Sequence, residues 1–207
     1  MTKALLFLNG EPPQQLPDLT DYDLIACTDG ALHYLLALNL PLEKLDFISG
    51  DFDSYSSKTL AQHLSEHKLI ATPDQNHTDF YKALNLLKQK GITQLDVFGA
   101  SGRSQDHFMG NLHCCYSFRQ QMQICCFDAY SRYFFIPSQF SIEHIQGKTL
   151  SLLPYANTTN VVSQGLKWEL TNQDLSLTTQ MSLRNVAIAD RVTIRYQQGA
   201  LIMFIAH

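Results

Sequence analysis

The chain has 207 residues, of which 45% are hydrophobic and 16% charged, so it can bury a substantial core and is not expected to be disordered. Its formal net charge is −4, with 15 Lys and Arg residues scattered against 19 Asp and Glu residues. Because no broad basic face results, the composition argues against a nucleic-acid partner.

The first two-thirds of the chain alternates short β-type runs with helical patterns. The β-type runs read KALLFLNG, DLIACTDG, LDFISGD, KLIATPD, QLDVFGASG and MQICCFDAY. Helices are predicted over residues 30–39, 78–90 and 104–119. Strands that alternate with helices predict an α/β domain with a parallel, Rossmann-like sheet and helices packed on its faces. We assign residues 1–133 to this domain.

After about residue 130 the pattern changes to short β-type runs separated by turn residues, with no convincing helix. These runs read RYFFIP, KTLSLLP, NVVSQGLKWEL, DLSLTT and RVTIRYQQGALIMFI. The simplest interpretation is a smaller all-β domain, sandwich-like or barrel-like, over residues 134–207.

The amino terminus and the cysteines favour a cytoplasmic protein. The apolar run in MTKALLFLNGEPP reaches Pro12 too soon for a signal peptide, and no later stretch approaches membrane length. Four of the five cysteines form two adjacent pairs, at positions 114–115 and 125–126, which is neither a disulfide framework nor a CxxC metal pattern. We therefore expect no membrane partner and cysteines that fill the core.

Aspartates collect where the predicted parallel strands end. They follow four different strand runs and are Asp29, Asp51, Asp53, Asp74, Asp79 and Asp106. Because ligands bind beyond the carboxyl ends of the strands in open parallel sheets, these residues predict a site at one edge.

Several carboxylates without clustered histidines describe an oxygen-ligated site that suits Mg²⁺ bound to substrate phosphates. Gly99, Gly102 and Arg103, before a predicted helix, add backbone donors and a cation for a phosphate chain. These features indicate phosphoryl or pyrophosphoryl transfer. The alternative is that each aspartate caps a helix or turn, which is plausible for Asp74 and Asp79 but does not require the pair Asp51 and Asp53.

A zinc-dependent hydrolase is a second hypothesis. The segment HLSEH, with His63, Glu66 and His67, matches the H-x-x-E-H pattern of inverted zinc peptidases, and Glu143 is available downstream. The pattern is short, however, and it leaves the aspartates at the strand ends unexplained.

The ordered motifs of the chain resemble the thiamine pyrophosphokinase family over nearly its whole length. They are CTDGALHYLL, DFISGDFDS, TPDQNHTDFYKAL, FGASGRSQDHFMGNL, SLLP and GLKWEL. The resemblance implies an enzyme that transfers pyrophosphate from ATP to thiamine, gives thiamine diphosphate and AMP, and requires Mg²⁺. It also implies a homodimer with active sites between subunits. A non-catalytic module that binds nucleotide or thiamine is the third hypothesis.

The resemblance also suggests which residues form the site. Asp51, Asp53 and Asp79 would be the catalytic and metal-binding residues. The residues that would bind ATP and the diphosphate are Asp29, Gly30, Ser54, Asp74, Gln75, Thr78, Lys82, Arg103 and Asp106. Ser182 and Asn185 would contact thiamine, although Arg184 stands where family members carry serine. Trp168, the single tryptophan, either stacks on the ligand or fills the core, and we favour a structural role near the cleft.

Overall fold

The computed structural model describes residues 2–52 and 68–207. Contacts between Cα atoms divide the chain into two compact units, Met1–Ala129 and Tyr130–His207. All helices of four or more residues in the described part lie in the first unit, and the second consists of strands and loops. No helix among the described residues has the length and apolar character needed to span a membrane.

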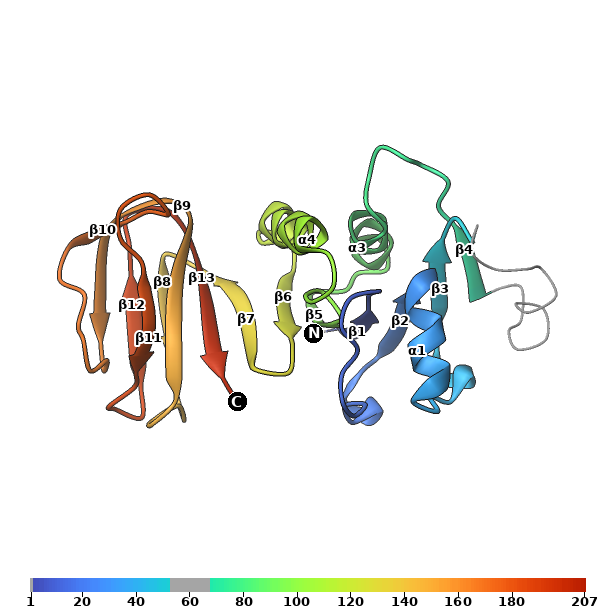
Figure 1. Ribbon diagram of the computed structural model, residues 1–207, viewed down its shortest axis with the longest axis horizontal. Coiled ribbons are helices and arrows are strands. Elements are labelled where there is room, and N and C mark those ends of the chain that lie inside the picture. Colours follow the sequence, from blue (N-terminus) through green and yellow to red (C-terminus); the bar gives the residue numbers. More distant parts are fainter. Residues whose placement is uncertain (1, 53–67) are drawn as a thin grey trace. The chain divides into compact units, whose positions relative to one another are not determined.

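The first unit contains a parallel sheet (Figure 1). Its strands are β1 (Lys3–Phe7), β2 (Leu24–Thr28), β3 (Phe47–Gly50), β4 (Leu69–Ala71), β5 (Gln94–Phe98) and β6 (Gln123–Phe127). Their order across the sheet is β4-β3-β2-β1-β5-β6, and each neighbouring pair is parallel. All six predicted β-type runs therefore form strands, and the predicted parallel pairing is confirmed.

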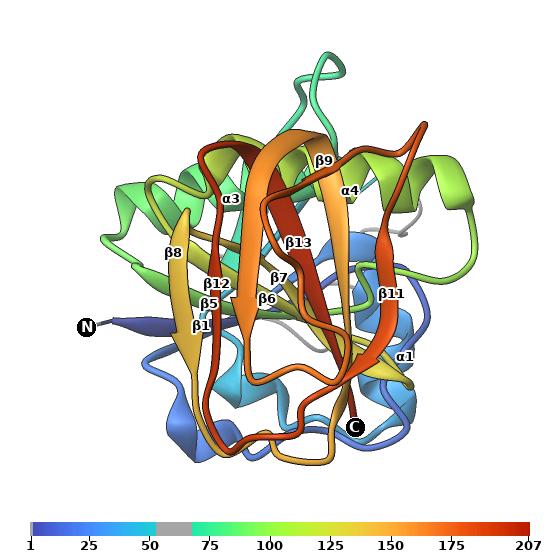
Figure 2. The ribbon, with the colours of Figure 1, turned by 90° about the vertical axis from the view of Figure 1, so that its left-hand side faces the viewer.

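The three predicted helices are α1 (Leu32–Ala37), α3 (Asp79–Gln89) and α4 (Gln105–Phe118). Helix α1 lies on one face of the sheet, and α3 and α4 lie on the other (Figures 1 and 2). The reason is topological: the chain moves from β2 to β3 in one direction across the sheet, and from β4 through β5 to β6 in the opposite direction. Right-handed crossovers then place the helices on opposite faces.

Helix α3 shows why these segments are helical. Phe80, Ala83, Leu84 and Leu87 recur at helical spacing and are all buried. Thr78 caps the amino end, since its Oγ1 accepts a hydrogen bond from Tyr81 N at 3.3 Å. Gly91, with φ +79°, follows the helix in the left-handed conformation that glycine adopts without strain. Short 3₁₀ turns at Leu19–Asp21, Asp29–Ala31 and Leu42–Lys44 complete the unit.

The second unit is all-β, as predicted. Its strands are β7 (Ser131–Ile136), β8 (Gln139–Ile142), β9 (Thr149–Gln164), β10 (Gln173–Leu175), β11 (Ser182–Val186), β12 (Val192–Arg195) and β13 (Gln198–Ala206). The first half of β9 pairs with β11 and β13, and its second half pairs with β10 and β12, all antiparallel. This long strand therefore joins two groups of strands around a core that contains Leu152, Val161 and Leu201 (Figure 2).

Candidate active site at the carboxyl ends of the parallel strands

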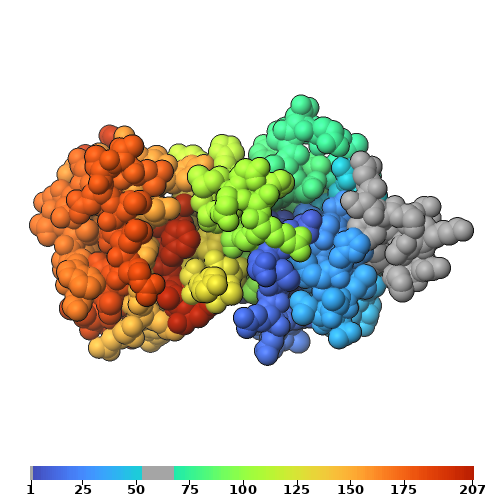
Figure 3. Space-filling model, in the orientation of Figure 1, coloured from blue at the N-terminus to red at the C-terminus, as the bar shows by residue number. Residues whose placement is uncertain are grey.

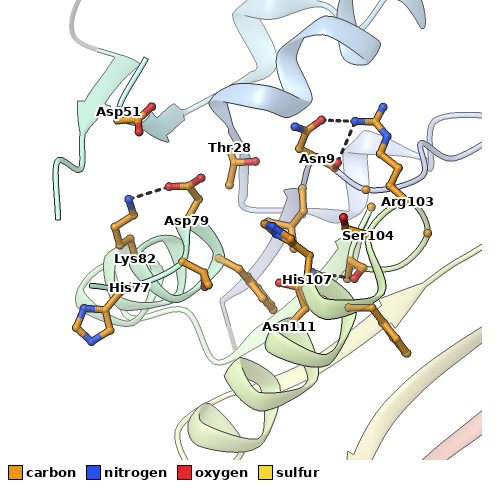
Figure 4. Close-up of a pocket in the computed structure, with 18 of the residues that line it drawn as sticks. Asn9, Thr28, Asp51, His77, Asp79, Lys82, Arg103, Ser104, His107 and Asn111 are labelled. Atoms are coloured by element: carbon orange, nitrogen blue, oxygen red, sulfur yellow. Dashed lines mark hydrogen bonds and ion pairs between the residues drawn. The ribbon is translucent and has the colours of Figure 1, made fainter. Parts of the chain in front are cut away.

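A cavity of about 400 Å³ lies where the strand order of the first unit reverses, between β1 and β5. Open α/β sheets bind ligands at this point because the loops after the two strands diverge toward opposite faces. The loops after β1, β3, β4 and β5, the end of β2 and the amino ends of α3 and α4 supply the lining residues (Figure 4).

Two carboxylates, Asp29 and Asp51, mark the ends of β2 and β3. Asp51 is exposed and lines the cavity. Asp29 is half-buried against Gly50, where a Cβ atom would lie 2.3 Å from Asp29 Cγ, so only glycine fits. Phe52 N donates to Asp29 Oδ2 at 3.1 Å, and Gly30 N donates to Asp29 Oδ1 at 2.6 Å. Asp29 thus fixes the backbone immediately after Asp51.

The surroundings of Asp29 shift the pKa of its carboxyl group. Burial raises its pKa above the usual range, the two backbone hydrogen bonds oppose the rise, and the charges of Asp79 and Asp51 add to it. The three carboxylates therefore share one region of negative potential, which favours a bound cation.

Helix α3 begins at the same edge. Thr78 is its N-cap residue, so the suggested capping role of Asp79 is wrong. Asp79 instead lines the cavity, and its Oδ1 lies 2.8 Å from Lys82 Nζ. Gln75, in the preceding loop, also lines the cavity and approaches Asp51 with its Nε2 at 3.5 Å from Oδ2.

The loop between β4 and α3 projects from the surface (Figures 1 and 3), and its residues from Pro73 to Thr78 are exposed. Asp74 organises it: its Oδ1 accepts from Asn76 N at 2.9 Å, and its Oδ2 lies 2.6 Å from His77 Nδ1. The hydrogen bond from His77 lowers the pKa of Asp74. Asp74 does not line the cavity, so it has the turn-forming role that the alternative hypothesis gave it.

Arg103 forms the opposite wall, between β5 and α4. Its Nη1 donates to Asn9 Oδ1 at 2.6 Å and to Asn9 O at 3.1 Å (Figure 4). Ser104, the N-cap residue of α4, makes no capping hydrogen bond with its side chain, and it lines the cavity. An uncapped helix start beside an arginine is suited to a phosphate group.

The structure brings together eight of the residues predicted from the sequence, and these line the same cavity: Asp51, Gln75, Thr78, Asp79, Lys82, Gly99, Gly102 and Arg103. Asp29 and Gly30 do not line the cavity but contact residues near it. Gly30 packs closely against Asn9, since a Cβ atom on Gly30 would lie 2.4 Å from Asn9 Nδ2. Asp106 is exposed, does not line the cavity and accepts from His107 N at 2.9 Å. Asp53 and Ser54 lie outside the described residues.

Sequence reasoning missed six polar lining residues: Asn9, Thr28, His77, Ser104, His107 and Asn111. Asn9 and Thr28 follow or end predicted strands, so the rule that selected the aspartates could have found them. His107 and Asn111 lie one helical turn apart on α4, a spacing that places both on one face.

In the second unit, the side chain of Asn185 forms two hydrogen bonds with the backbone of Trp168. Asn185 is 2% exposed, its Nδ2 donates to Trp168 O at 2.7 Å, and its Oδ1 accepts from Trp168 N at 3.1 Å. Ser182 is half-buried on β11. Trp168 itself is 56% exposed, so the alternative in which it fills the core is wrong.

The side chains at the cavity can be compared with the ligands that Mg²⁺ and Zn²⁺, the metals expected from the sequence, prefer. Among residues 2–52 and 68–207, no three His, Cys, Asp or Glu side chains are grouped to hold a metal ion. Mg²⁺ keeps several waters and needs only one or two carboxylates besides substrate phosphates, so Asp51 and Asp79 fit it. His63, Glu66 and His67 of the zinc hypothesis lie outside the described residues. The five cysteines, all within the described part, form no disulfide, and only Cys125 is not buried.

Comparisons with known proteins give the same family over most of the chain. Residues 18–127 match the family model "Thiamin pyrophosphokinase, catalytic domain", and residues 138–201 match "Thiamin pyrophosphokinase, vitamin B1 binding domain". A thiamine pyrophosphokinase of Bacillus subtilis is 26% identical over 97% of both chains. Thiamine pyrophosphokinase 1 of Oryza sativa is 27% identical over 92% of this chain and 82% of its own.

Solved structures share the fold. The crystal structure of thiamine pyrophosphokinase from Bacillus subtilis superimposes with a TM-score of 0.82 at 23% identity, covering 98% of each chain. The thiamin pyrophosphokinase from Candida albicans gives a TM-score of 0.84 at 19% identity, covering 99% of this chain and 88% of the other.

Proposed function

Because the chain belongs to the thiamin pyrophosphokinase family, it is a transferase that moves pyrophosphate from ATP to thiamine, and we propose that the transfer takes place in the cavity between β1 and β5. One observation carries this assignment: Asp51 and Asp79 face Arg103 and the uncapped start of α4 across a single cavity. The matches support the transferase and not the zinc-dependent hydrolase.

The chain's own residues bind and align the nucleotide in this proposal. Arg103, held by Asn9, and the amino end of α4 bind the polyphosphate at one wall. Gln75 and Thr78 bind it at the other wall, and Ser54 is a further proposed ligand of the nucleotide. Asp29, Gly30, Asp74 and Asp106 hold the backbone around the site. Lys82 belongs to the same wall and holds Asp79 through an ion pair.

Mg²⁺ would be held by Asp51 and Asp79, together with Asp53, and would neutralise charge on the phosphates during transfer. The residues around the cavity orient the reactants for in-line displacement. The hydroxyl oxygen of thiamine forms a bond to the β-phosphorus, and the bond from this phosphorus to the oxygen that bridges it to the α-phosphorus breaks. AMP leaves with that electron pair, and a nearby carboxylate accepts the hydroxyl proton.

In our proposal the second unit binds thiamine. All the residues that line the cavity belong to the first unit, whereas the vitamin B1 binding model matches residues 138–201. We therefore propose that Ser182, Asn185 and Trp168 form or support the thiamine site, and that the enzyme is a homodimer with active sites between subunits.

We also propose that residues 1–133 form a Rossmann-like catalytic domain that binds ATP and Mg²⁺. Residues 134–207 then form a thiamine-binding and dimerisation domain. We further propose that the protein is cytoplasmic. The parallel order of β1 to β6 supports the first assignment.

The site assignment is tested by calorimetric titration with α,β-methylene-ATP and Mg²⁺. This analogue cannot transfer its pyrophosphate, so binding is measured alone. We expect Arg103→Ala and Asp51→Asn to weaken binding about 10-fold or more, because each removes a charged contact. Wild-type affinity in both variants would place the nucleotide elsewhere.

A further inference from the structure

The side chain of Thr28 lies at the wall of the cavity without a hydrogen-bonding partner in the described part of the chain. Thr28 is the last residue of β2, is 3% exposed and lines the cavity. Its hydroxyl does not cap the 3₁₀ turn that follows, and it bonds to none of residues 2–52 and 68–207. A hydroxyl at a cavity wall that bonds to no described protein group is available to a ligand that enters the cavity.

The strand geometry explains why this hydroxyl meets the cavity. Ile25 and Cys27 belong to the core cluster that also contains Leu32 and Leu35 of α1. Since successive strand residues point to opposite faces, Thr28 points to the face that carries α3 and α4. Figure 4 shows it between Asp79 on one side and Asn9 on the other.

The groups around Thr28 indicate what it binds. A threonine hydroxyl has one O–H group, so it can donate a hydrogen bond to an anionic ligand oxygen. On the side opposite Asp79, Arg103 and the start of α4 attract an anion. A ligand oxygen between these walls, negatively charged and accepting hydrogen bonds, would satisfy the Thr28 hydroxyl.

We propose that Thr28 Oγ1 donates a hydrogen bond to a non-bridging oxygen of the ATP polyphosphate and is therefore a substrate-binding residue. This inference rests on the proposed function, because it takes the cavity as the site of the nucleotide. It adds a neutral donor between the wall that carries Asp79 and the wall that carries Arg103.

Two substitutions separate a binding role from a structural one. Thr28→Val keeps the size and the branched shape of the buried side chain but removes the hydroxyl. Thr28→Ser keeps the hydroxyl but loses a methyl group. We expect Thr28→Val to raise the Kd of α,β-methylene-ATP with Mg²⁺ about 10- to 100-fold, as loss of a hydrogen bond to a charged acceptor does. Thr28→Ser should remain within about threefold of wild type.

Melting temperatures should follow the opposite order. Thr28→Val should melt close to the wild-type temperature, since it keeps the buried volume and breaks no hydrogen bond to another described residue. Thr28→Ser should melt below it, since it loses a buried methyl group. If Thr28 had only a structural role, the more stable of the two variants would also bind α,β-methylene-ATP more tightly.

Ser49→Ala is the matched control. Ser49 pairs with Thr28 in register, is 1% exposed and has a buried hydroxyl without a partner among the described residues, yet it is not one of the described residues that line the cavity. It should bind the analogue as wild type does. Wild-type affinity in Thr28→Val, or equal losses in both Thr28 variants, would overturn the proposal. If Arg103→Ala still weakened binding, only the Thr28 assignment would fail; if the wild-type chain did not bind the analogue, both would fail.

Discussion

Lys82 Nζ lies 2.8 Å from Asp79 Oδ1, and the same ammonium group donates to the carbonyl oxygens of Thr72 at 2.9 Å and Asp74 at 3.2 Å. An ammonium group has three N–H bonds, so these acceptors use all of them. The Lys82 side chain is 10% exposed. Lys82 thus ties the start of α3 to the loop after β4 and orients Asp79 toward the cavity.

Lys82→Met should therefore destabilise the fold by about 1–3 kcal/mol, because two carbonyl groups lose a charged donor. Urea unfolding measures this loss. A lysine that contacted phosphate directly would give a different result: the variant would lose ATP affinity while its unfolding free energy stayed unchanged. That result would contradict the network of Lys82 with Asp79, Thr72 and Asp74.

Asp51→Asn should lower kcat about 100-fold or more at saturating Mg²⁺, because it removes a charge where negative charge must be balanced during transfer. Its melting temperature should hardly change, since Asp51 is exposed. Asp21→Asn is the control, because Asp21 is an exposed aspartate in the turn Leu19–Asp21, between β1 and β2, and does not line the cavity. Near-normal turnover in Asp51→Asn would remove Asp51 from the metal site.

The raised pKa of Asp29 predicts a dependence of stability on pH. Burial is the main cause, so protonation of this carboxyl favours the folded state. Its contribution to stability is fully present below the unfolded pKa, about 3.9 for an aspartate, and is lost as the pH rises through the folded value. Asp29→Asn, which does not titrate, should gain stability relative to wild type over that range.

Urea unfolding at a series of pH values from about 3 to 7 measures this difference. Carbon-13 NMR of the Asp29 carboxyl group gives the folded pKa directly, and Asp74, whose pKa is lowered by its hydrogen bond from His77, should titrate below it. A titration of Asp29 below that of Asp74 would show that its hydrogen bonds outweigh burial.

The exposure of Trp168 predicts that Trp168→Leu changes ligand binding more than stability. An aromatic face attracts the cationic ring of thiamine by about 0.5–2 kcal/mol, which corresponds to a rise in KM of up to about 30-fold. Asn185→Ala should lower both stability and affinity, because the buried amide holds the backbone of Trp168. A large fall in melting temperature with an unchanged KM in Trp168→Leu would restore the core assignment.

Sites shared between subunits predict complementation. A chain with Asp51→Asn and a chain with Trp168→Ala should each be poorly active, and a mixture of the two should recover activity as one intact site forms in a mixed dimer. Wild-type activity should also fall on dilution. Failure to recover activity after proven subunit exchange would indicate sites built within one chain.

Much of the fold could be predicted because its signals are local. The helical spacing of Phe80, Ala83, Leu84 and Leu87 and the strand-to-helix alternation describe α3 and the parallel sheet without tertiary information. The rule that strand ends meet at one edge then brings Asp51 and Asp79 together.

Other features depend on the conformation of loops. The network around Lys82 requires backbone carbonyls that only the folded loop after β4 positions. The exposure of Trp168 could not be predicted from the sequence for the same reason. In a continuous strand Trp168 would lie on the same face as Leu166 and Leu170, which are buried. The chain leaves β9 at Gln164 and turns at Gly165, with φ +92°, so the alternation ends before Trp168.

Incubation of the purified chain with ATP, Mg²⁺ and thiamine, followed by separation of the nucleotide products, is the most direct test of the proposed activity and site. Attack at the β-phosphorus predicts AMP and thiamine diphosphate in equal amounts, and Asp51→Asn should reduce both together. ADP with thiamine monophosphate, or no product at all, would contradict pyrophosphate transfer in this cavity.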